Sequence, residues 1–124
     1  MAELTPITGE LQLHVMSAVW RIGGGTVRDI RAALPSRYRG AYNTMQTVLN
    51  RLSDRGLLSH HEVGNAIAYR ARMSEDDYLA RSVTLMLARA SPDARRAAVA
   101  WLVSTASDEE LDDIQRGRVG LRRT

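Results

Sequence analysis

Apolar residues recur every three or four positions in three consecutive segments of the first half of the chain, and this spacing predicts three helices. The first helix is expected over Gly9–Ile22, with Thr8 as its N-cap, and a glycine triplet follows it. The second begins after Thr26, another N-cap candidate, and stops before Pro35, because proline cannot continue a helix. The third is expected over Ala41–Gly56, whose final glycine suits a left-handed cap.

The helical spacing gives way to alternation after Leu57. Two short runs around Gly64–Asn65 predict a β-hairpin, although Gly-Asn is a weaker turn signal than Asn-Gly. Further helices are expected to begin at three serine N-caps, Ser74, Ser91 and Ser107. The order therefore predicts a mainly α fold with a small β-hairpin wing, a winged helix-turn-helix followed by C-terminal dimerisation helices.

The third helix combines an apolar stripe with a row of small hydrogen-bonding side chains. At about 100° per residue, its apolar residues fall within one third of the helix circumference, and the polar ones fall opposite. Asn and Gln can bond an adenine edge in two places, Arg can do so to guanine, and Thr offers a methyl and a hydroxyl group. A solvated polar face is the alternative interpretation. The candidate base-reading residues are Asn43, Gln46, Thr47, Asn50 and Arg51.

Basic and hydroxyl residues surround the start of this helix. Arg side chains attract phosphates, and hydroxyl and N–H groups at a helix start can bond them. The predicted wing turn carries no basic residue, so fewer phosphate contacts are expected there. Plain loop and cap roles are the alternative for these residues. The candidate phosphate-contacting residues are Arg37, Arg39, Tyr42, Thr44 and Arg70.

Four segments occur in a fixed order: LQLHVMSAVW, TVRDIRAAL, AYNTMQTVLNRLSDRGLL and a hairpin that ends in AYRARMS. Together they resemble the BlaI/MecI/CopY family, the penicillinase-repressor type of winged-helix regulator. The third segment is close to the family pattern Ala-Tyr-x-Thr-x-x-Thr-Val-Leu-x-Arg-Leu. The likeness runs from about Leu11 to Leu79 and more weakly to about Ile114. The resemblance implies a homodimeric repressor whose winged-helix domains bind double-stranded operator DNA with an inverted repeat.

The helices expected over residues 74–114 are amphipathic, but this stretch is too short to build a separate core. Their apolar side chains need a surface to pack against, and a second copy offers a two-fold interface of the same patches. Folding back onto the winged helix within a monomer is the alternative. The candidate dimer-interface residues are Val83, Leu87, Val99, Trp101, Leu102 and Leu111.

Two features of the family are altered in this chain. In the penicillinase repressors, a membrane-linked protease signal is thought to end in cleavage at an Asn-Phe bond of the dimerisation helices. The equivalent bond here joins Ala100 and Trp101, which keeps an aromatic residue but not the Asn. This bond is the candidate cleavage site, and a membrane sensor-protease pathway is a candidate partner. The copper-responsive branch uses a Cys-rich motif, and a chain without cysteine cannot sense copper by that route.

Charge and composition narrow the setting. All seventeen basic residues are Arg, and residues 1–73 carry nine of them against five acidic residues, a net charge of +4. The absence of cysteine excludes disulfides and favours a reducing cytoplasm. No signal-peptide pattern and no apolar run of about 20 residues occur, so we expect no membrane insertion. The expected regions are a winged-helix DNA-binding domain (1–73), a helical dimerisation region (74–116) and a frayed tail (117–124).

No pattern in the sequence indicates catalysis, a metal site or a cofactor. His60 and His61 are adjacent on a predicted strand, so their side chains point to opposite faces. The triplet Gly23–Gly25 lacks the preceding strand and the following Lys-Ser/Thr of a phosphate loop, and is interpreted as a flexible turn. Two functions remain: a sequence-specific transcriptional repressor released by an unknown signal, or a winged-helix module that binds another protein. No feature supports an enzyme.

Overall fold

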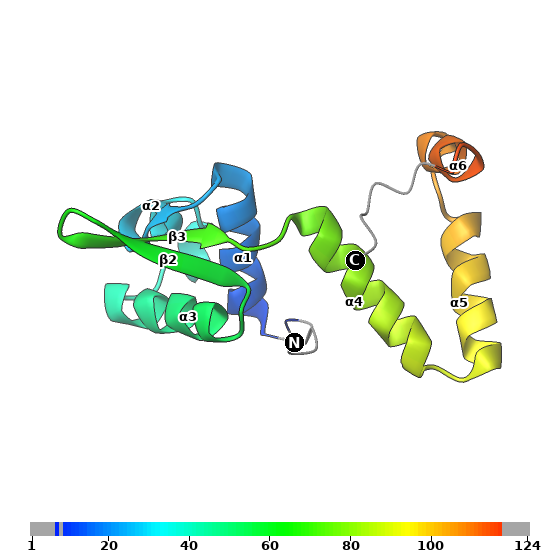
Figure 1. Cartoon of the computed structure of the whole chain (residues 1–124), viewed down its shortest axis with the longest axis horizontal. Helices are drawn as coiled ribbons and strands as arrows, with labels where there is room; N and C mark the ends of the chain where they lie inside the picture. The colour runs from blue at the N-terminus through cyan, green and yellow to red at the C-terminus, as the bar shows by residue number, and fades with distance from the viewer. Residues whose placement is uncertain (1–6, 8, 118–124) are drawn as a thin grey trace. The chain divides into compact units, whose positions relative to one another are not determined.

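The structure is a computed structural model that describes Ile7 and residues 9–117 (Figure 1). Contacts divide the chain between Glu75 and Asp76 into two compact units. The predicted Thr8 cap and the predicted tail beyond residue 117 lie outside the described residues. The elements are α1 (Glu10–Ile22), β1 (Gly25–Thr26), α2 (Val27–Ala32), the 3-10 helix η1 (Ser36–Tyr38), α3 (Tyr42–Asp54), β2 (Leu58–Val63), β3 (Ala66–Ala71), α4 (Glu75–Arg89), α5 (Pro92–Ser104) and α6 (Asp108–Gln115).

The first unit contains three α-helices and a small antiparallel sheet with the strand order β1-β3-β2. Strand β3 is central: its residue Tyr69 pairs with Gly25 on one side and with His60 on the other. The predicted winged-helix fold is confirmed, and so is the hairpin. The third strand was not predicted, because two residues directly after a helix carry no alternating pattern.

Several predicted boundaries are wrong by a few residues. Helix α1 begins at Glu10, with Gly9 at the N-cap position, and α2 ends at Ala32 rather than just before Pro35. The segment between the second and third predicted helices, where no helix was expected, contains the short helix η1. Helix ends are the least certain part of a sequence prediction, since propensity changes little from one residue to the next.

Side-chain caps explain where α2, α5 and α6 begin. Thr26 and Asp29 form a reciprocal capping box at the start of α2, with N···O distances of 3.3 and 3.0 Å. Ser107 and Glu110 repeat this arrangement at the start of α6, where their hydrogen bonds lower the pKa of the Glu110 carboxyl. The Ser91 hydroxyl accepts from the N–H of Ala94 at the start of α5.

The glycine triplet is a built turn rather than a flexible one. Gly23 ends α1 in the left-handed conformation, with φ +82°. Gly24 has φ +104°, and a Cβ added to it would lie 2.4 Å from the carbonyl oxygen of Tyr69. Only glycine lets the chain pass this close to β3, so the triplet brings β1 into the sheet.

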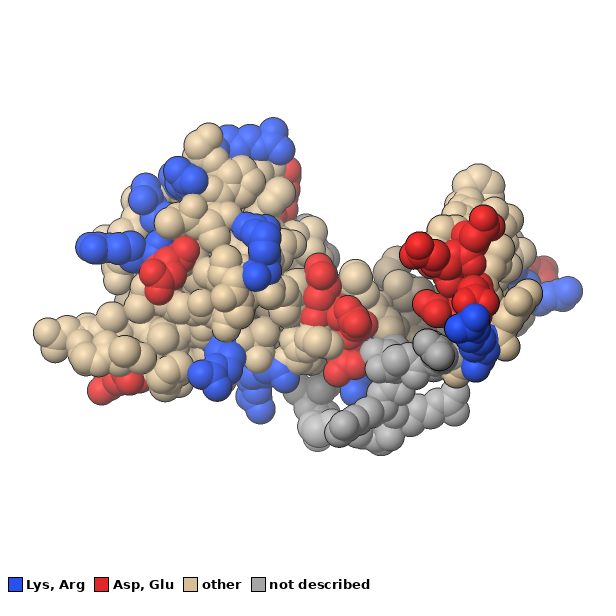
Figure 2. Space-filling view, turned by 90° about the horizontal axis from the view of Figure 1, so that it is seen from above, with Lys and Arg blue, Asp and Glu red and all other residues tan. Residues whose placement is uncertain are grey.

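In its described residues, 76–117, the second unit has three helices that leave many apolar side chains exposed. Helix α5 has no buried residue, and α4 has two, Tyr78 and Ser82. Acidic side chains gather over α6, whereas the Arg side chains of the first unit are spread over several places on its surface (Figure 2). The net positive charge of the first unit is therefore not concentrated in one patch on this view.

Candidate nucleic-acid interface

Helix α3 packs into the core of the first unit by one stripe and exposes the opposite face. Met45, Leu49 and Leu52 are fully buried and Val48 is 8% exposed, as their spacing predicted. Four of the five candidate base-reading residues are exposed, and the fifth is half-buried. The exposed members are Asn43, Thr47, Asn50 and Arg51, and the half-buried member is Gln46.

Two hydrogen bonds tie one flank of this polar face to the sheet. The Tyr69 hydroxyl on β3 donates to Asn50 Oδ1 at 2.8 Å. Ser53 Oγ and His60 Nδ1 on β2 lie 2.9 Å apart in a second hydrogen bond. Neither contact was predicted from the sequence, because a helix-to-sheet contact depends on packing that residue spacing does not encode. Asn50 therefore lies at the sheet side of the polar face.

Thr47 lies on the open part of the same face. Its hydroxyl donates to the backbone carbonyl of Asn43, one helical turn earlier, at 3.0 Å. Thr47 is exposed, and this local bond uses its hydroxyl proton but not the oxygen lone pairs or the methyl group. Thr47 can therefore offer an acceptor and an apolar contact, the latter suited to a thymine methyl.

The segment before α3 is held by several contacts to neighbouring elements. The Arg39 guanidinium donates to the carbonyl oxygens of Leu34 at 2.9 Å and Ala32 at 3.2 Å, so it closes the C-terminal end of α2. Arg31 Nε donates to the carbonyl of Gly40 at 2.8 Å. Arg39 thus has a structural role in this structure, which the sequence did not reveal.

Arg37 is exposed like Arg39, but its guanidinium lies against an aromatic ring. Its guanidinium carbon lies 4.8 Å from the centre of the Tyr38 ring. The other face of the segment is anchored to α1: the Tyr38 ring stacks on His14 with centroids 4.0 Å apart, and the Tyr38 hydroxyl bonds Glu10. The bond to Glu10 raises the pKa of the Tyr38 phenol. This anchoring fixes the backbone that carries the exposed Arg37.

The N-terminus of α3 is open to solvent. Its N-cap residue Ala41 offers no side-chain hydrogen bond, and Tyr42 and Thr44 in the first turn are exposed. The first N–H groups of a helix have no intrahelical acceptor, and the helix dipole favours an anion beside them. The arrangement is compatible with phosphate contact at this end of α3.

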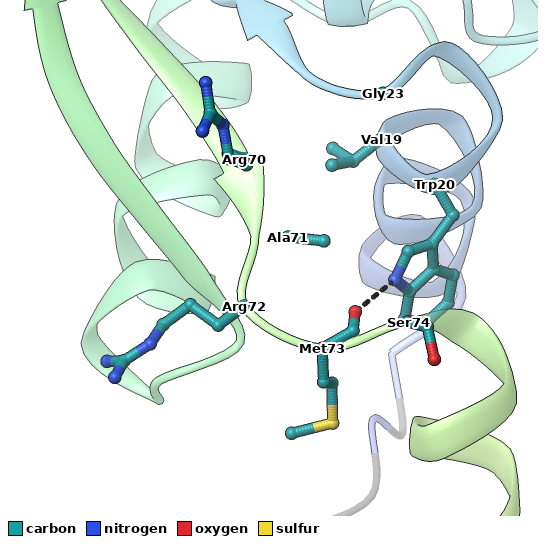
Figure 3. A pocket seen from close by; sticks show the side chains of 8 residues that line it. All are labelled: Val19, Trp20, Gly23, Arg70, Ala71, Arg72, Met73 and Ser74. Carbon is teal, nitrogen blue, oxygen red and sulfur yellow. Dashed lines mark hydrogen bonds between the residues drawn. The ribbon is translucent and has the colours of Figure 1, made fainter. Parts of the chain in front are cut away.

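The wing carries its one candidate phosphate contact, Arg70, on β3, where the residue is exposed. A pocket of about 280 Å³ lies between α1 and the end of β3. Val19, Trp20 and Ala71 form its walls, whereas the guanidinium groups of Arg70 and Arg72 point away from it (Figure 3). The charged ends of both arginines are therefore directed to solvent rather than into the pocket.

Other kinds of site are not assembled in the part of the chain that the structure describes. No group of three or more His, Cys, Asp or Glu side chains is placed there to hold a metal ion. Within the same residues, no helix is both long and apolar enough to cross a bilayer. The exposed polar face of α3 is therefore the candidate binding surface of the first unit.

The candidate dimer residues are exposed or half-buried within the chain. Exposed fractions are 69% for Trp101 and 52% for Leu102, while Leu87 and Leu111 are half-buried. Further apolar residues of the same helices are exposed as well, as expected for amphipathic helices without a covered apolar face. These additional exposed residues are Leu79, Met86, Val103 and Ile114. Val83 and Val99 are exposed as well, so α4, α5 and α6 each leave large apolar side chains open to solvent.

Comparison with known proteins gives consistent results. The family model for penicillinase repressors matches residues 8–117. The transcriptional regulator BlaI of Mycobacterium tuberculosis is 33% identical over 118 residues, which cover 94% of this chain and 85% of that protein. The solution structure of the DNA-binding domain of the repressor BlaI matches with a TM-score of 0.51 and 26% identity, over 60% of this chain and 90% of that one. The Bacillus licheniformis BlaI monomeric form, solved in complex with the blaP half-operator, matches with a TM-score of 0.50 and 27% identity, over 62% and 94%.

Proposed function

The chain belongs to the penicillinase repressor family, and we propose that it is a sequence-specific DNA-binding transcriptional repressor that acts as a homodimer on an operator with an inverted repeat. The family consists of transcriptional repressors, so the protein is not an enzyme. We assign DNA binding to residues 1–73 and dimerisation to residues 74–116. Because its partner is DNA, we place the protein in the cytoplasm.

The observation that carries this proposal is the exposed polar face of α3 opposite a fully buried apolar stripe. In a helix-turn-helix protein, the second helix of the motif, which corresponds to α3 here, lies in the major groove and presents its outer residues to base edges. A similar unit has been solved in complex with half-operator DNA. The polar face of α3 has side chains of the types that bond base edges, and its one acidic residue, Asp54, is the last residue of the helix.

We assign base reading to polar side chains of α3, and contacts with the DNA phosphates to residues around them. The base-reading set is Asn43, Gln46, Thr47, Asn50 and Arg51. Exposed Arg37 and Arg70, together with Tyr42 and Thr44 at the start of α3, are the phosphate contacts. Arg39 contributes to phosphate binding chiefly by holding the segment before α3, because its guanidinium already bonds two carbonyl groups.

The homodimer is proposed from the apolar surface of α4–α6. Soluble proteins rarely leave so many large apolar side chains of neighbouring helices in water. A second copy would cover them with the same patches through a two-fold axis. Two winged helices would then face two half-sites separated by about one DNA turn or a multiple of it.

Release by proteolysis is part of this proposal. The bond between Ala100 and Trp101 lies in α5, and both residues are exposed within one chain. A protease that acts after a membrane sensor signal would reach this bond once the dimer opens. Cleavage there would separate α6 and the last turn of α5, from Trp101 to Ser104, from the rest and so weaken the dimer. Mass spectrometry of the protein recovered from induced cells checks the position of the cut.

Selection of bound duplexes from a random-sequence DNA library tests the main proposal. The full-length protein should enrich an inverted repeat, and its affinity for that duplex should exceed that for a scrambled one by roughly 10³ or more. Enrichment of no common sequence would contradict a sequence-specific repressor. Failure to bind any duplex at low salt would instead favour the second candidate, a winged helix that binds protein, which the uncharged wing turn from Val63 to Ala66 supports.

A further inference from the structure

The hydrogen bond between Tyr69 and Asn50 fixes the orientation of a candidate base-reading side chain. The Tyr69 hydroxyl donates to Asn50 Oδ1 at 2.8 Å. The oxygen and nitrogen of an amide leave its carbon about 120° apart, so when the oxygen turns towards β3, the nitrogen turns away from it. Asn50 is itself exposed on the polar face of α3.

Tyr69 is a rigid anchor for this bond. Its side chain is only 1% exposed, and its backbone belongs to the central strand, between Gly25 and His60. The backbone of Gly24 passes so close to the Tyr69 carbonyl that no Cβ fits between them. The phenol therefore cannot follow a rotation of Asn50, and the amide must adapt to the phenol.

The hydroxyl of Tyr69 acts as the donor in this pair. Burial raises the pKa of the phenol, and the nearby Tyr42 raises it further, so the hydroxyl keeps its proton throughout the neutral pH range. A buried hydroxyl proton needs an acceptor, and Oδ1 is the acceptor of the Asn50 amide. The opposite amide orientation would leave that proton facing the two protons of Nδ2.

An amide held in one orientation can match the hydrogen-bonding groups of fewer bases than an amide that rotates freely. In the major groove, guanine shows two acceptors, N7 and O6, whereas adenine shows one acceptor and one donor. An amide that turns freely can match adenine with both of its groups. We propose that Tyr69 is a positioning residue that turns the Asn50 amide nitrogen to the groove, so that Asn50 selects guanine over adenine at one position of each half-site. This inference rests on the proposed function.

The alternative interpretation is that Asn50 only supplies a hydrogen-bond acceptor for the hydroxyl of the buried Tyr69. Both interpretations predict some loss of stability when the bond is removed, so stability does not separate them. Only a positioning role predicts a change of base preference confined to the position that Asn50 reads. Library selection measures that preference at every position of the site.

The experiment compares four full-length proteins on one random duplex library: the unmodified protein, Tyr69→Phe, Asn50→Ala and Ser53→Ala. Ser53 is the matched control, because it also joins α3 to the sheet, through His60, but does not touch Asn50. Asn50→Ala identifies the position that Asn50 reads. There the unmodified protein should favour guanine over adenine by at least about fivefold, and Tyr69→Phe should reduce this ratio to about twofold or less. Ser53→Ala should keep the ratio.

A second variant keeps the test decisive if Tyr69→Phe does not fold. Asn50→Asp retains an oxygen for the Tyr69 hydroxyl and replaces the outward nitrogen by an acceptor. It should therefore shift the preference from guanine to cytosine, whose N4 group donates.

Each other outcome overturns a defined part of the account. Four results would each refute positioning by Tyr69 while leaving the repressor function intact. They are an unchanged ratio in Tyr69→Phe, the same change in Ser53→Ala, a preference of the unmodified protein for adenine, and the absence of any Asn50-dependent position. If the unmodified protein enriched no sequence, the proposed function and this inference would both fail.

Discussion

The indole Nε1 of Trp20 donates a 3.0 Å hydrogen bond to the backbone carbonyl of Met73, and so joins α1 to the segment that follows β3 (Figure 3). The two residues are 53 positions apart in the sequence. The bond fixes the end of the hairpin against the first helix of the unit. The indole is half-buried, and its hydrogen bond links two segments that lie far apart in the sequence.

Trp20→Phe should destabilise the first unit by about 1–2 kcal/mol, because it keeps an aromatic ring but leaves the Met73 carbonyl without the indole N–H. Urea unfolding followed by circular dichroism measures the loss. Leu13→Ala is the control on the same helix, since Leu13 is 41% exposed and its truncation should cost less than about 0.5 kcal/mol. Equal midpoints for Trp20→Phe and the unmodified protein would show that this bond contributes nothing.

Gly24→Ala should be more destabilising than Gly23→Ala. Both residues have positive φ, so alanine at either position carries a conformational cost of about 1–2 kcal/mol. Only at Gly24 would the added Cβ also meet the Tyr69 carbonyl, at 2.4 Å, whereas nothing lies within 4 Å of a Cβ at Gly23. Thermal unfolding of the two variants should differ clearly, with Gly24→Ala the lower. Equal melting temperatures would mean that β1 does not hold its place in the sheet.

Arg37→Ala and Arg39→Ala should separate DNA binding from folding. Arg37 is exposed, so its removal should weaken binding to operator and scrambled duplexes about equally, lower the salt slope by about one, and leave the melting temperature unchanged. Arg39→Ala should lower the melting temperature as well, because two carbonyl groups at the end of α2 lose their donor. Anisotropy titrations and thermal unfolding on the same samples check both. An equal melting temperature for the two variants would argue against the capping role.

Thr47→Ala should act differently from both arginine variants. It removes an exposed acceptor and a methyl group from the open part of the α3 face. We expect a loss of about 1–3 kcal/mol in the preference for operator over scrambled DNA, with nearly unchanged binding to the scrambled duplex. Ratios of dissociation constants from parallel titrations give this number. A ratio equal to that of the unmodified protein would remove Thr47 from the base-reading set.

Trp101→Ala should weaken the proposed dimer without unfolding the protomer. Trp101 is 69% exposed in one chain, so its truncation removes few internal contacts, but aromatic residues often dominate an interface. We expect the dimer dissociation constant to rise by roughly 30-fold or more, as measured by analytical ultracentrifugation. Arg96→Ala, on the same helix, should change it little. If the unmodified protein stayed monomeric at all concentrations, the homodimer proposal would be wrong.

How far the sequence predicted this fold depended on the kind of signal. The buried stripe of α3 and the caps at Thr26 and Ser107 follow from local spacing and hydrogen-bonding chemistry, and both were predicted. Strand β1 was missed because it depends on a close approach to Tyr69, which joins residues far apart in the sequence. The carbonyl contacts of Arg39 were missed for the same reason.

The candidate site shows the same division. The sequence identified which side chains of α3 face away from the core, because helical geometry alone decides that. It did not reveal that Tyr69 holds Asn50 or that Ser53 meets His60, since these contacts depend on how the sheet packs against the helix. Base reading by the exposed residues stays a prediction.

The central claim is sequence-specific DNA binding through α3, and an anisotropy titration tests it most directly. The labelled duplex comes from the region upstream of the protein's own gene, and a scrambled duplex of equal length is titrated beside it at two salt concentrations. We predict tighter binding to the native duplex by roughly 10³ or more, with both affinities falling steeply as salt rises. Equal affinity for the two duplexes would contradict the account if the duplexes enriched from a random library also bound no more tightly than the scrambled one.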